Sequence, residues 1–282
     1  MKIFVIIITA LIFLNISSKL YSQELPALVT DRPDITESAL TVQKNRLQIE
    51  TGFLFLKREN LNLNLNSGSG VDSGMYTVLN KDISLPGVLF RYGISSYAEL
   101  RLGLLIKYSE VSYDKFYDGS NSTDLAPVNI GGKFELSEQD GIIPTAAVIL
   151  QGEIPALSTE SNTEDSKDWF DPSIVFCFNN SVSKNFSLGY NIGFDLSDGF
   201  TEGNGVFYSL SAGYSFSDSF SGFVEYFGST NFYHLIPKNG MDFGFAYLIN
   251  NNIQLDISAG AELLDISKEH FISTGFSIRL PD

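Results

Sequence analysis

The sequence predicts an all-β protein, a closed antiparallel up-and-down transmembrane β-barrel of about 12 strands. The main observation is a series of short segments in which apolar and polar residues alternate, as in 186–196. A period of two places successive side chains on opposite faces of a strand. One apolar face and one small or polar face are typical of strands that separate lipid from a wet lumen. Charged residues make up only 18 % of the chain, which favours a lipid-facing surface over one in water.

The first segment, residues 1–22, has the features of a secretory signal peptide. Lys2 precedes an apolar stretch over 3–16, and small or tolerable residues for cleavage end at Ser22. The alternative is a membrane-spanning helix, but the stretch is short for one and no basic stop-transfer cluster follows it. We therefore expect export across the inner membrane and residence in the bacterial outer membrane.

Residues 23–45 predict a periplasmic or lumenal leader that lies outside the strands. Two prolines make a long helix or strand there improbable on physical grounds. The leader carries a charged motif made of Asp31, Arg32, Pro33, Asp34 and Glu37. We expect the leader to tuck into or under the barrel lumen, where these charges would meet charges on the inner wall.

The remaining residues, 46–282, predict the barrel itself. Segment lengths match the roughly 9–11 residues that a tilted strand needs to cross a bilayer. The expected strands are 46–57, 83–92, 97–111, 126–136, 142–154, 170–182, 186–196, 206–216, 219–228, 240–249, 252–262 and 270–280.

The connections between these segments alternate in length, which is typical of outer-membrane barrels with short periplasmic turns and longer outer loops. The expected long connections are 58–82, 112–125, 155–169, 197–205 and 229–239, with a moderate one at 263–269. The expected short ones are 93–96, 137–141, 183–185, 217–218 and 250–251.

Charged residues on the inward face concentrate at the periplasmic ends of strands that should be neighbours once the last strand closes on the first. An isolated lumenal charge needs a partner, so a structural lattice is one interpretation. A selectivity ring is the other. This predicted lumenal cluster consists of Arg46, Glu50, Arg91, Glu99, Arg101 and Arg279.

Composition and motifs argue against several other classes of protein. A net charge of −15 disfavours binding to nucleic acid. The single Cys177 cannot form an internal disulfide. No serine-hydrolase, zinc-protease, CxxC or phosphate-loop motif is present, so we expect no catalytic residue, no metal site and no cofactor. The two histidines, His234 and His270, are expected in or beside outer loops, with His270 on the strand face opposite Ser273.

Several stretches of the leader and the first strands resemble one bacterial family, labelled putative meta-pathway of phenol degradation. They are Thr30-Asp-Arg-Pro-Asp34, Thr36-Glu-Ser38, Arg46-Leu-Gln-Ile-Glu-Thr-Gly-Phe53, Phe90-Arg-Tyr-Gly93 and Ala98-Glu-Leu-Arg-Leu-Gly103. The resemblance implies an outer-membrane barrel, often described as a transporter, and a role in passing small compounds, aromatic ones among them. It implies no catalytic residues.

Three classes of function remain open. The favoured one is passive or facilitated passage of a small solute through a narrow lumen. The second is a non-conducting structural or adhesive protein that acts through its outer loops, and the third is an outer-membrane lipid hydrolase. The expected partners are outer-membrane lipid and lipopolysaccharide, the outer-membrane insertion machinery and a small-molecule solute.

Overall fold

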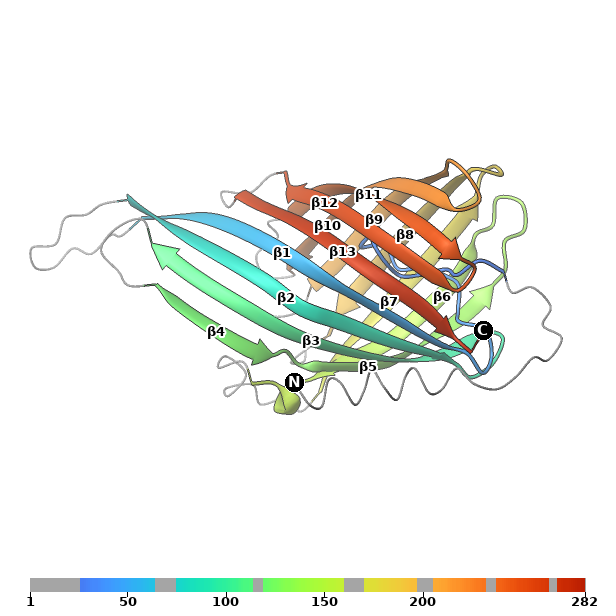
Figure 1. The fold of residues 1–282 in the computed structure, drawn as a ribbon, viewed down its shortest axis with the longest axis horizontal. Helices are drawn as coiled ribbons and strands as arrows, with labels where there is room; N and C mark the ends of the chain where they lie inside the picture. Colours follow the sequence, from blue (N-terminus) through green and yellow to red (C-terminus); the bar gives the residue numbers. More distant parts are fainter. Residues whose placement is uncertain are drawn as a thin grey trace, which may run out of the picture.

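The computed structural model describes residues 26–63, 75–113, 119–159, 170–196, 205–231, 237–263 and 268–281. They form one antiparallel sheet that closes on itself (Figure 1). Its strands are β1 (Leu47–Leu63), β2 (Met75–Gly93), β3 (Ala98–Tyr113), β4 (Ser120–Leu125), β5 (Val128–Ser137), β6 (Thr145–Ile154), β7 (Asp171–Ser181), β8 (Phe186–Asp195), β9 (Gly205–Ser215), β10 (Phe220–Asn231), β11 (Lys238–Asn250), β12 (Ile253–Glu262) and β13 (Lys268–Leu280). A single 3₁₀ turn, Pro155–Leu157, follows β6.

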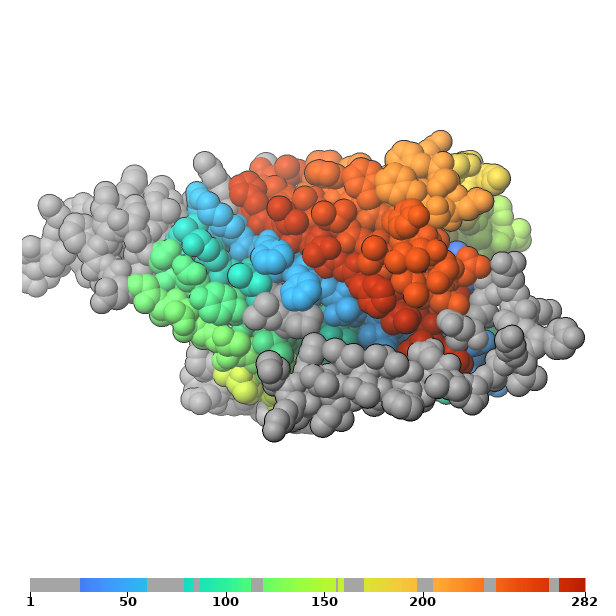
Figure 2. Space-filling view, viewed as in Figure 1, coloured from blue at the N-terminus to red at the C-terminus, as the bar shows by residue number. Residues whose placement is uncertain are grey.

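The barrel closes between its first and last strands. β1 pairs with β2 on one side and with β13 on the other, from Leu47 opposite Leu280 to Glu59 opposite Lys268. In Figure 2 the blue surface of β1 lies directly between the red surface of β13 and the teal surface of β2. Closure leaves no unpaired edge in lipid, which a membrane-spanning sheet requires.

Thirteen segments make a twelve-stranded barrel because β4 and β5 pair with the same neighbour, β3. Ala126 and Pro127 separate them, and the Ala126 N–H still donates to the Leu105 carbonyl at 2.9 Å. Proline has no N–H to donate, so the ladder is interrupted there and then resumes. The predicted twelve-stranded closed barrel is confirmed.

Two of the predicted loops are wrong in part. β1 runs on to Leu63 and β2 begins at Met75, so much of the expected loop 58–82 is strand, and β4 occupies the end of the expected loop 112–125. These extensions are held by polar pairs, such as Arg58 with Glu269 and Lys81 with Glu110 at 3.4 Å. The alternation of apolar residues identifies strands in lipid, and it does not identify strands that continue into water.

Side chains separate by face as the alternation predicts. On β12, Gln254, Asp256 and Ser258 are buried in the lumen, whereas Leu255 and Ile257 point outward and are about half exposed. The five connections 94–97, 138–144, 182–185, 216–219 and 251–252 lie at one end of the barrel, which we call the short-turn end. Among the described residues, no helix is long and apolar enough to cross a membrane.

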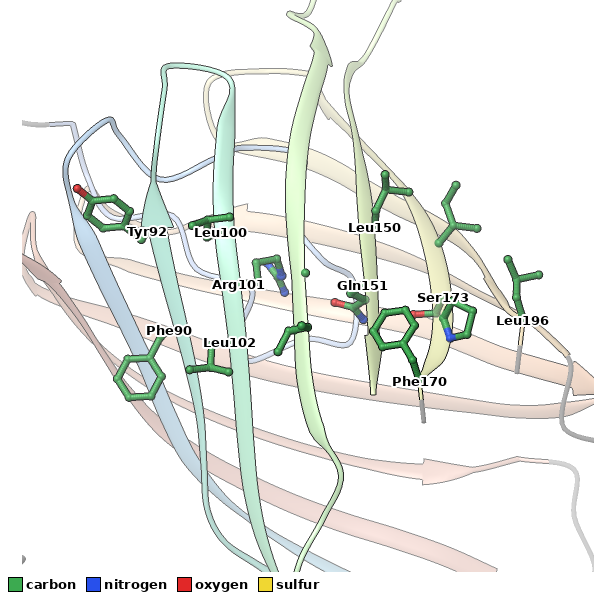
Figure 3. A pocket seen from close by; sticks show the side chains of 14 residues that line it. Phe90, Tyr92, Leu100, Arg101, Leu102, Leu150, Gln151, Phe170, Ser173 and Leu196 are labelled. Carbon is green, nitrogen blue, oxygen red and sulfur yellow. The ribbon is translucent and has the colours of Figure 1, made fainter. Parts of the chain in front are cut away.

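One large pocket, of about 750 Å³, lies on the outer surface across β2, β3, β5, β6 and β7 (Figure 3). Outward side chains such as Phe90, Leu102 and Leu150 line it. Backbone pairing continues beneath it, with Gly131 opposite Gln151 and Gln151 opposite Ser173. It is therefore a groove in the lipid-facing surface and not a passage through the wall.

Candidate functional site

The described part of the leader, residues 26–45, lies inside the barrel at its short-turn end (Figure 1). At the N-terminal side, the Leu28 N–H donates to the carbonyl of Asn251, in a short turn, at 2.9 Å. At the other side, Asn45 N–H donates to the Gly93 carbonyl at 2.7 Å, just before β1 begins. Between these two ends the leader crosses the lumen and hydrogen-bonds to side chains of most strands.

The strongest attachment of the leader is Asp31, which is 8 % exposed. Its carboxylate forms ion pairs with Arg91 at 3.1 Å, Arg101 at 2.5 Å and Lys133 at 2.8 Å. Burial alone would raise the pKa of Asp31, but these three cations hold it well below its usual value. We call Asp31, Arg91, Arg101 and Lys133 the basic anchor.

Three further carboxylates balance the basic anchor. Glu50 and Glu99 accept from Arg91 at 2.9 and 2.8 Å, and Arg101 reaches Glu99 at 3.1 Å. Glu37 of the leader pairs with Arg101 at 2.9 Å. Each acid is satisfied by a cation or by an N–H, as buried charges require.

The structure brings together four of the six residues in the predicted lumenal cluster: Glu50, Arg91, Glu99 and Arg101. Arg279 is buried, but it donates to the carbonyls of Pro26 and Asn251, at 2.7 and 3.0 Å, near the beginning of the described leader. Arg46 donates to the Pro281 carbonyl, away from the others.

The predicted cluster omitted Lys133, which contacts Asp31 and donates to the Ser38 carbonyl at 2.7 Å. A sequence signal for it existed. Lys133 points inward by the alternation of β5, and it stands directly opposite Glu99 in the register of β3 and β5.

Arg32, the next residue of the leader motif, lies against bare backbone of the wall. Its guanidinium covers Gly52 of β1 and Gly275 of β13, which are direct partners in the sheet. A Cβ at Gly52 would stand 2.5 Å from the Arg32 Cζ, so only glycine leaves room there. In this seat Arg32 donates to Asp256 at 3.0 Å and to Ser273 at 2.9 Å.

On the opposite wall the leader meets acidic side chains. The Ile35 N–H donates to Glu225 of β10 at 2.7 Å, and the Thr36 hydroxyl donates to the other Glu225 oxygen. Asp34 lies in the same region, where burial, together with the charge of Glu225, raises its pKa well above its usual value.

Four phenylalanines, Phe207, Phe223, Phe227 and Phe271, point into the lumen, and each stands directly opposite a glycine of the next strand. Each ring covers its glycine so closely that a Cβ would not fit. The rings of Phe227 and Phe271 also contact each other, with centroids 6.3 Å apart, above the glycines of β11 and β12. Counted from the short turns, Phe207, Phe227 and Phe271 lie just beyond the leader and give that part of the lumen an aromatic wall.

A second cavity, of about 270 Å³, lies at the short-turn end between the leader and β7 to β12. It is lined by polar groups that include Asn179, Ser187, Ser211 and Gln254. Beside it, Ala39 of the leader packs on an apolar patch of the inner wall formed by Ala147, Ile149, Val175 and Cys177. The leader therefore separates an aromatic outer lumen from a polar vestibule.

Residues 30–280 match the model of the family described as "Putative MetA-pathway of phenol degradation". The chain belongs to this family. The stretches of sequence that resemble the family contain Asp31, Arg32, Arg91 and Arg101, which are among the residues that attach the leader to the wall, and Gly52, which leaves room for Arg32.

Solved structures show the fold of the family member described here. An outer-membrane channel from Pseudomonas putida F1 is 10 % identical, with a TM-score of 0.60, and the match covers 86 % of this chain and 98 % of that one. The transport unit of the autotransporter AIDA-I from Escherichia coli is also 10 % identical, with a TM-score of 0.50 and coverage of 85 % and 91 %. No curated protein matches the chain.

These likenesses show the fold, a closed barrel with an apolar outward face, which is the form in which proteins cross the outer membrane of Gram-negative bacteria. The short-turn end is accordingly the periplasmic end. The leader thus enters the lumen from the periplasm.

Proposed function

We propose that the protein passes small aromatic solutes across the outer membrane, and that the leader gates their path. The observation that carries this proposal is the aromatic wall of Phe207, Phe227 and Phe271 immediately outside the leader. Apolar rings facing a lumen offer stacking and burial to an aromatic solute and little to a sugar or an ion. The structural neighbour from P. putida is an outer-membrane channel, and the family description names phenol degradation.

The path has three stages from outside to inside. A solute first rests on the aromatic wall, then passes the leader on the side of β8 to β10, and reaches the polar vestibule of about 270 Å³. The leader is anchored by ion pairs on the opposite side, at Arg91, Arg101 and Lys133. Opening on the β8 to β10 side therefore leaves both the basic anchor and the Arg32–Asp256 pair intact.

The second candidate, a structural or adhesive protein, would act through outer loops, most of which lie outside the described residues. The third, a lipid hydrolase, needs a histidine beside an inward serine. His270 is exposed on the outer face of β13 and Ser273 is buried on the inner face, so this pair cannot form a dyad. His234 lies outside the described residues.

The test is uptake of 4-nitrophenol into proteoliposomes, measured against protein-free liposomes of the same lipid. Phe227→Ser and Phe271→Ser should slow uptake, because each removes part of the aromatic wall. Phe243→Ser is the matched control, since Phe243 is 55 % exposed and faces lipid. Uptake no faster than in empty liposomes, or equal loss in all three variants, would contradict the proposal.

The gate is tested separately with the chain's single cysteine. Ala39 of the leader and Cys177 of β7 belong to the same buried apolar cluster, so an Ala39→Cys variant places a second thiol in that cluster, and its oxidation with Cys177 would tie the leader to β7. Uptake should stop on oxidation and return on reduction. If oxidation forms the crosslink and uptake continues unchanged, the leader is not the gate.

A further inference from the structure

Two carboxylates face each other directly on the acidic side of the lumen. Glu225 of β10 and Asp242 of β11 are partners in the register of the sheet, and both point inward. They are 1 % and 2 % exposed. Side chains directly opposite on neighbouring strands have Cβ atoms only about 4.5–5.5 Å apart. The two acids therefore share one buried space, which we call the acid pair.

Asp242 lacks partners that a buried carboxylate needs. Neither of its oxygens has a hydrogen-bond partner among the described residues, although both are inaccessible to solvent. Its Cβ lies against Gly260, under the ring of Phe271, so the aromatic wall covers it from outside. A bare carboxylate in such a place is strongly unfavourable.

Nearby charges do not neutralise the acid pair. Within the described part of the chain, the leader's Arg32 pairs with Asp256, and the three cations of the basic anchor pair with Asp31, Glu37, Glu50 and Glu99. On the facing elements, Asp34 of the leader and Glu262 of β12 are themselves acidic. On β11 itself, Lys238 is exposed at the first position of the strand and forms no ion pair with either acid among the described residues. Strands β8 and β9 face the pair with Asn191, Ser209 and Ser211, which carry no charge.

We propose that Glu225 and Asp242 form a proton-binding site, and that the shared proton latches the leader to the wall. Two carboxylates this close in a medium of low dielectric constant do not both ionise, so the pair retains one proton. In this form Asp242 is neutral and Glu225 accepts the Ile35 N–H and the Thr36 hydroxyl. The raised pKa of neighbouring Asp34 agrees with an excess of negative charge at this place.

Loss of the proton opens the latch. The proton passes to water in the vestibule, which Asp34 and Thr36 also line. Two adjacent negative charges then repel each other, and they repel Asp34 once its own carboxyl ionises, so the leader segment around Asp34 to Thr36 moves off β9 and β10. The basic anchor holds the leader in place near Asp31. The latch acts on the gate of the proposed function, so this inference rests on that function. Whether the latch is open or closed is nevertheless measured without any transport.

The test labels the wall beneath the latch. Ser209 is 6 % exposed and lies 2.7 Å from the Thr36 hydroxyl, so a Ser209→Cys thiol in a full-length Cys177→Ala background reports whether Thr36 covers it. Methyl methanethiosulfonate is the probe. The rate at which it labels the introduced thiol is measured in the refolded protein with and without the two substitutions Glu225→Gln and Asp242→Asn. Both amides mimic the protonated acids at every pH.

At each pH, the labelling rate of the protein that keeps both acids (the acid form) is divided by that of the protein that carries the amides (the amide form). We expect this ratio to rise by about tenfold or more from about pH 6 to about pH 9. Taking the ratio removes most of the effect of pH on the ionisation of the introduced thiol. Nearby carboxylates disfavour the thiolate, so their charge alone would lower the labelling rate of the acid form, which is opposite to the expected change. Asp218→Asn, an acid in an exposed periplasmic turn, is the control and should leave the rate unchanged.

A ratio that is constant with pH overturns the latch. If the double amide variant does not refold, Asp242→Asn alone carries the test, since one amide already removes the second titratable group. A ratio that rises with pH, combined with no uptake of 4-nitrophenol, would retain the latch and overturn the proposed passage.

Discussion

The seat of Arg32 gives the sharpest quantitative prediction. Gly52 and Gly275 are opposite each other in β1 and β13, and the Arg32 guanidinium covers both. A Cβ at Gly275 would lie 2.3 Å from the Arg32 Nε and 2.5 Å from its Nη2, closer than a Cβ atom comes to a non-bonded heavy atom, so Arg32 must shift. Gly275→Ala therefore forces Arg32 out of its seat without touching the basic anchor.

The magnitude follows from the contacts that are lost. When Arg32 is displaced, it loses its ion pair with Asp256 at 3.0 Å and its hydrogen bond to Ser273 at 2.9 Å. The Asp256 side chain is fully buried. Breaking a buried ion pair costs about 3–5 kcal/mol, but the Arg32 side chain is 25 % exposed and solvent recovers part of this. We expect about 2 kcal/mol less stabilisation of the seated leader, or roughly 30-fold more of the unseated state.

The assay is limited proteolysis of the leader in the refolded barrel, with folding checked by heat-modifiable gel migration. When opening is fast relative to cleavage, the cleavage rate follows the population of the open state, so it should rise by roughly 30-fold. Gly87→Ala is the matched control. Gly87 pairs with Gly52 from the other side, in β2, and a Cβ there meets Leu105 at 3.4 Å and the Gly52 carbonyl oxygen at 4.0 Å, which are ordinary contacts. Equal cleavage in the two variants would refute the argument.

Three further predictions concern the leader and its anchor. Deleting residues 23–45 should raise single-channel conductance in a planar bilayer, and unchanged conductance would show that the leader does not obstruct the lumen. Asp31→Asn leaves the buried Lys133, Arg91 and Arg101 short of one negative charge, at a cost of about 3–5 kcal/mol, and should speed cleavage of the leader more than Gly275→Ala does. The pKa of Asp31 is lowered, so the stabilisation that Asp31 gives to the seated leader is fully present above the ordinary aspartate pKa. It is lost only as pH falls through the lowered pKa. A rate of leader cleavage that already increases on acidification to about pH 5 would contradict this.

The fold follows from the sequence because lipid imposes a simple requirement on every strand. Outward positions such as Leu255 and Ile257 must be apolar, and the alternation therefore marks the part of each strand that lies in the membrane. The polar extension of β1 toward Leu63 and the short β4 lie outside this requirement. Their pairing depends on neighbours across the sheet, which a single segment of sequence does not specify.

The site was predictable only as far as the direction of each side chain decides its partners. Glu50, Arg91, Glu99 and Arg101 point inward at the periplasmic end, and they meet. Arg279 also points inward, but it donates to the Pro26 carbonyl of the leader and does not join the other four. The acid pair of Glu225 and Asp242 depends on the register between β10 and β11, and register is not contained in the alternation of either strand.

The leader lies between a basic and an acidic part of the barrel wall, and the charges of its consecutive residues are opposite to those of the wall that each one faces. Asp31 faces the cations of β2, β3 and β5, and Arg32 faces Asp256 of β12, so adjacent residues pull toward different parts of the wall. On the remaining side, Glu225 receives only an N–H and a hydroxyl. Hydrogen bonds of that kind are weaker than buried ion pairs whose removal leaves an unpaired charge. The leader should therefore release first from β9 and β10, beside the vestibule, while Asp31 stays bound.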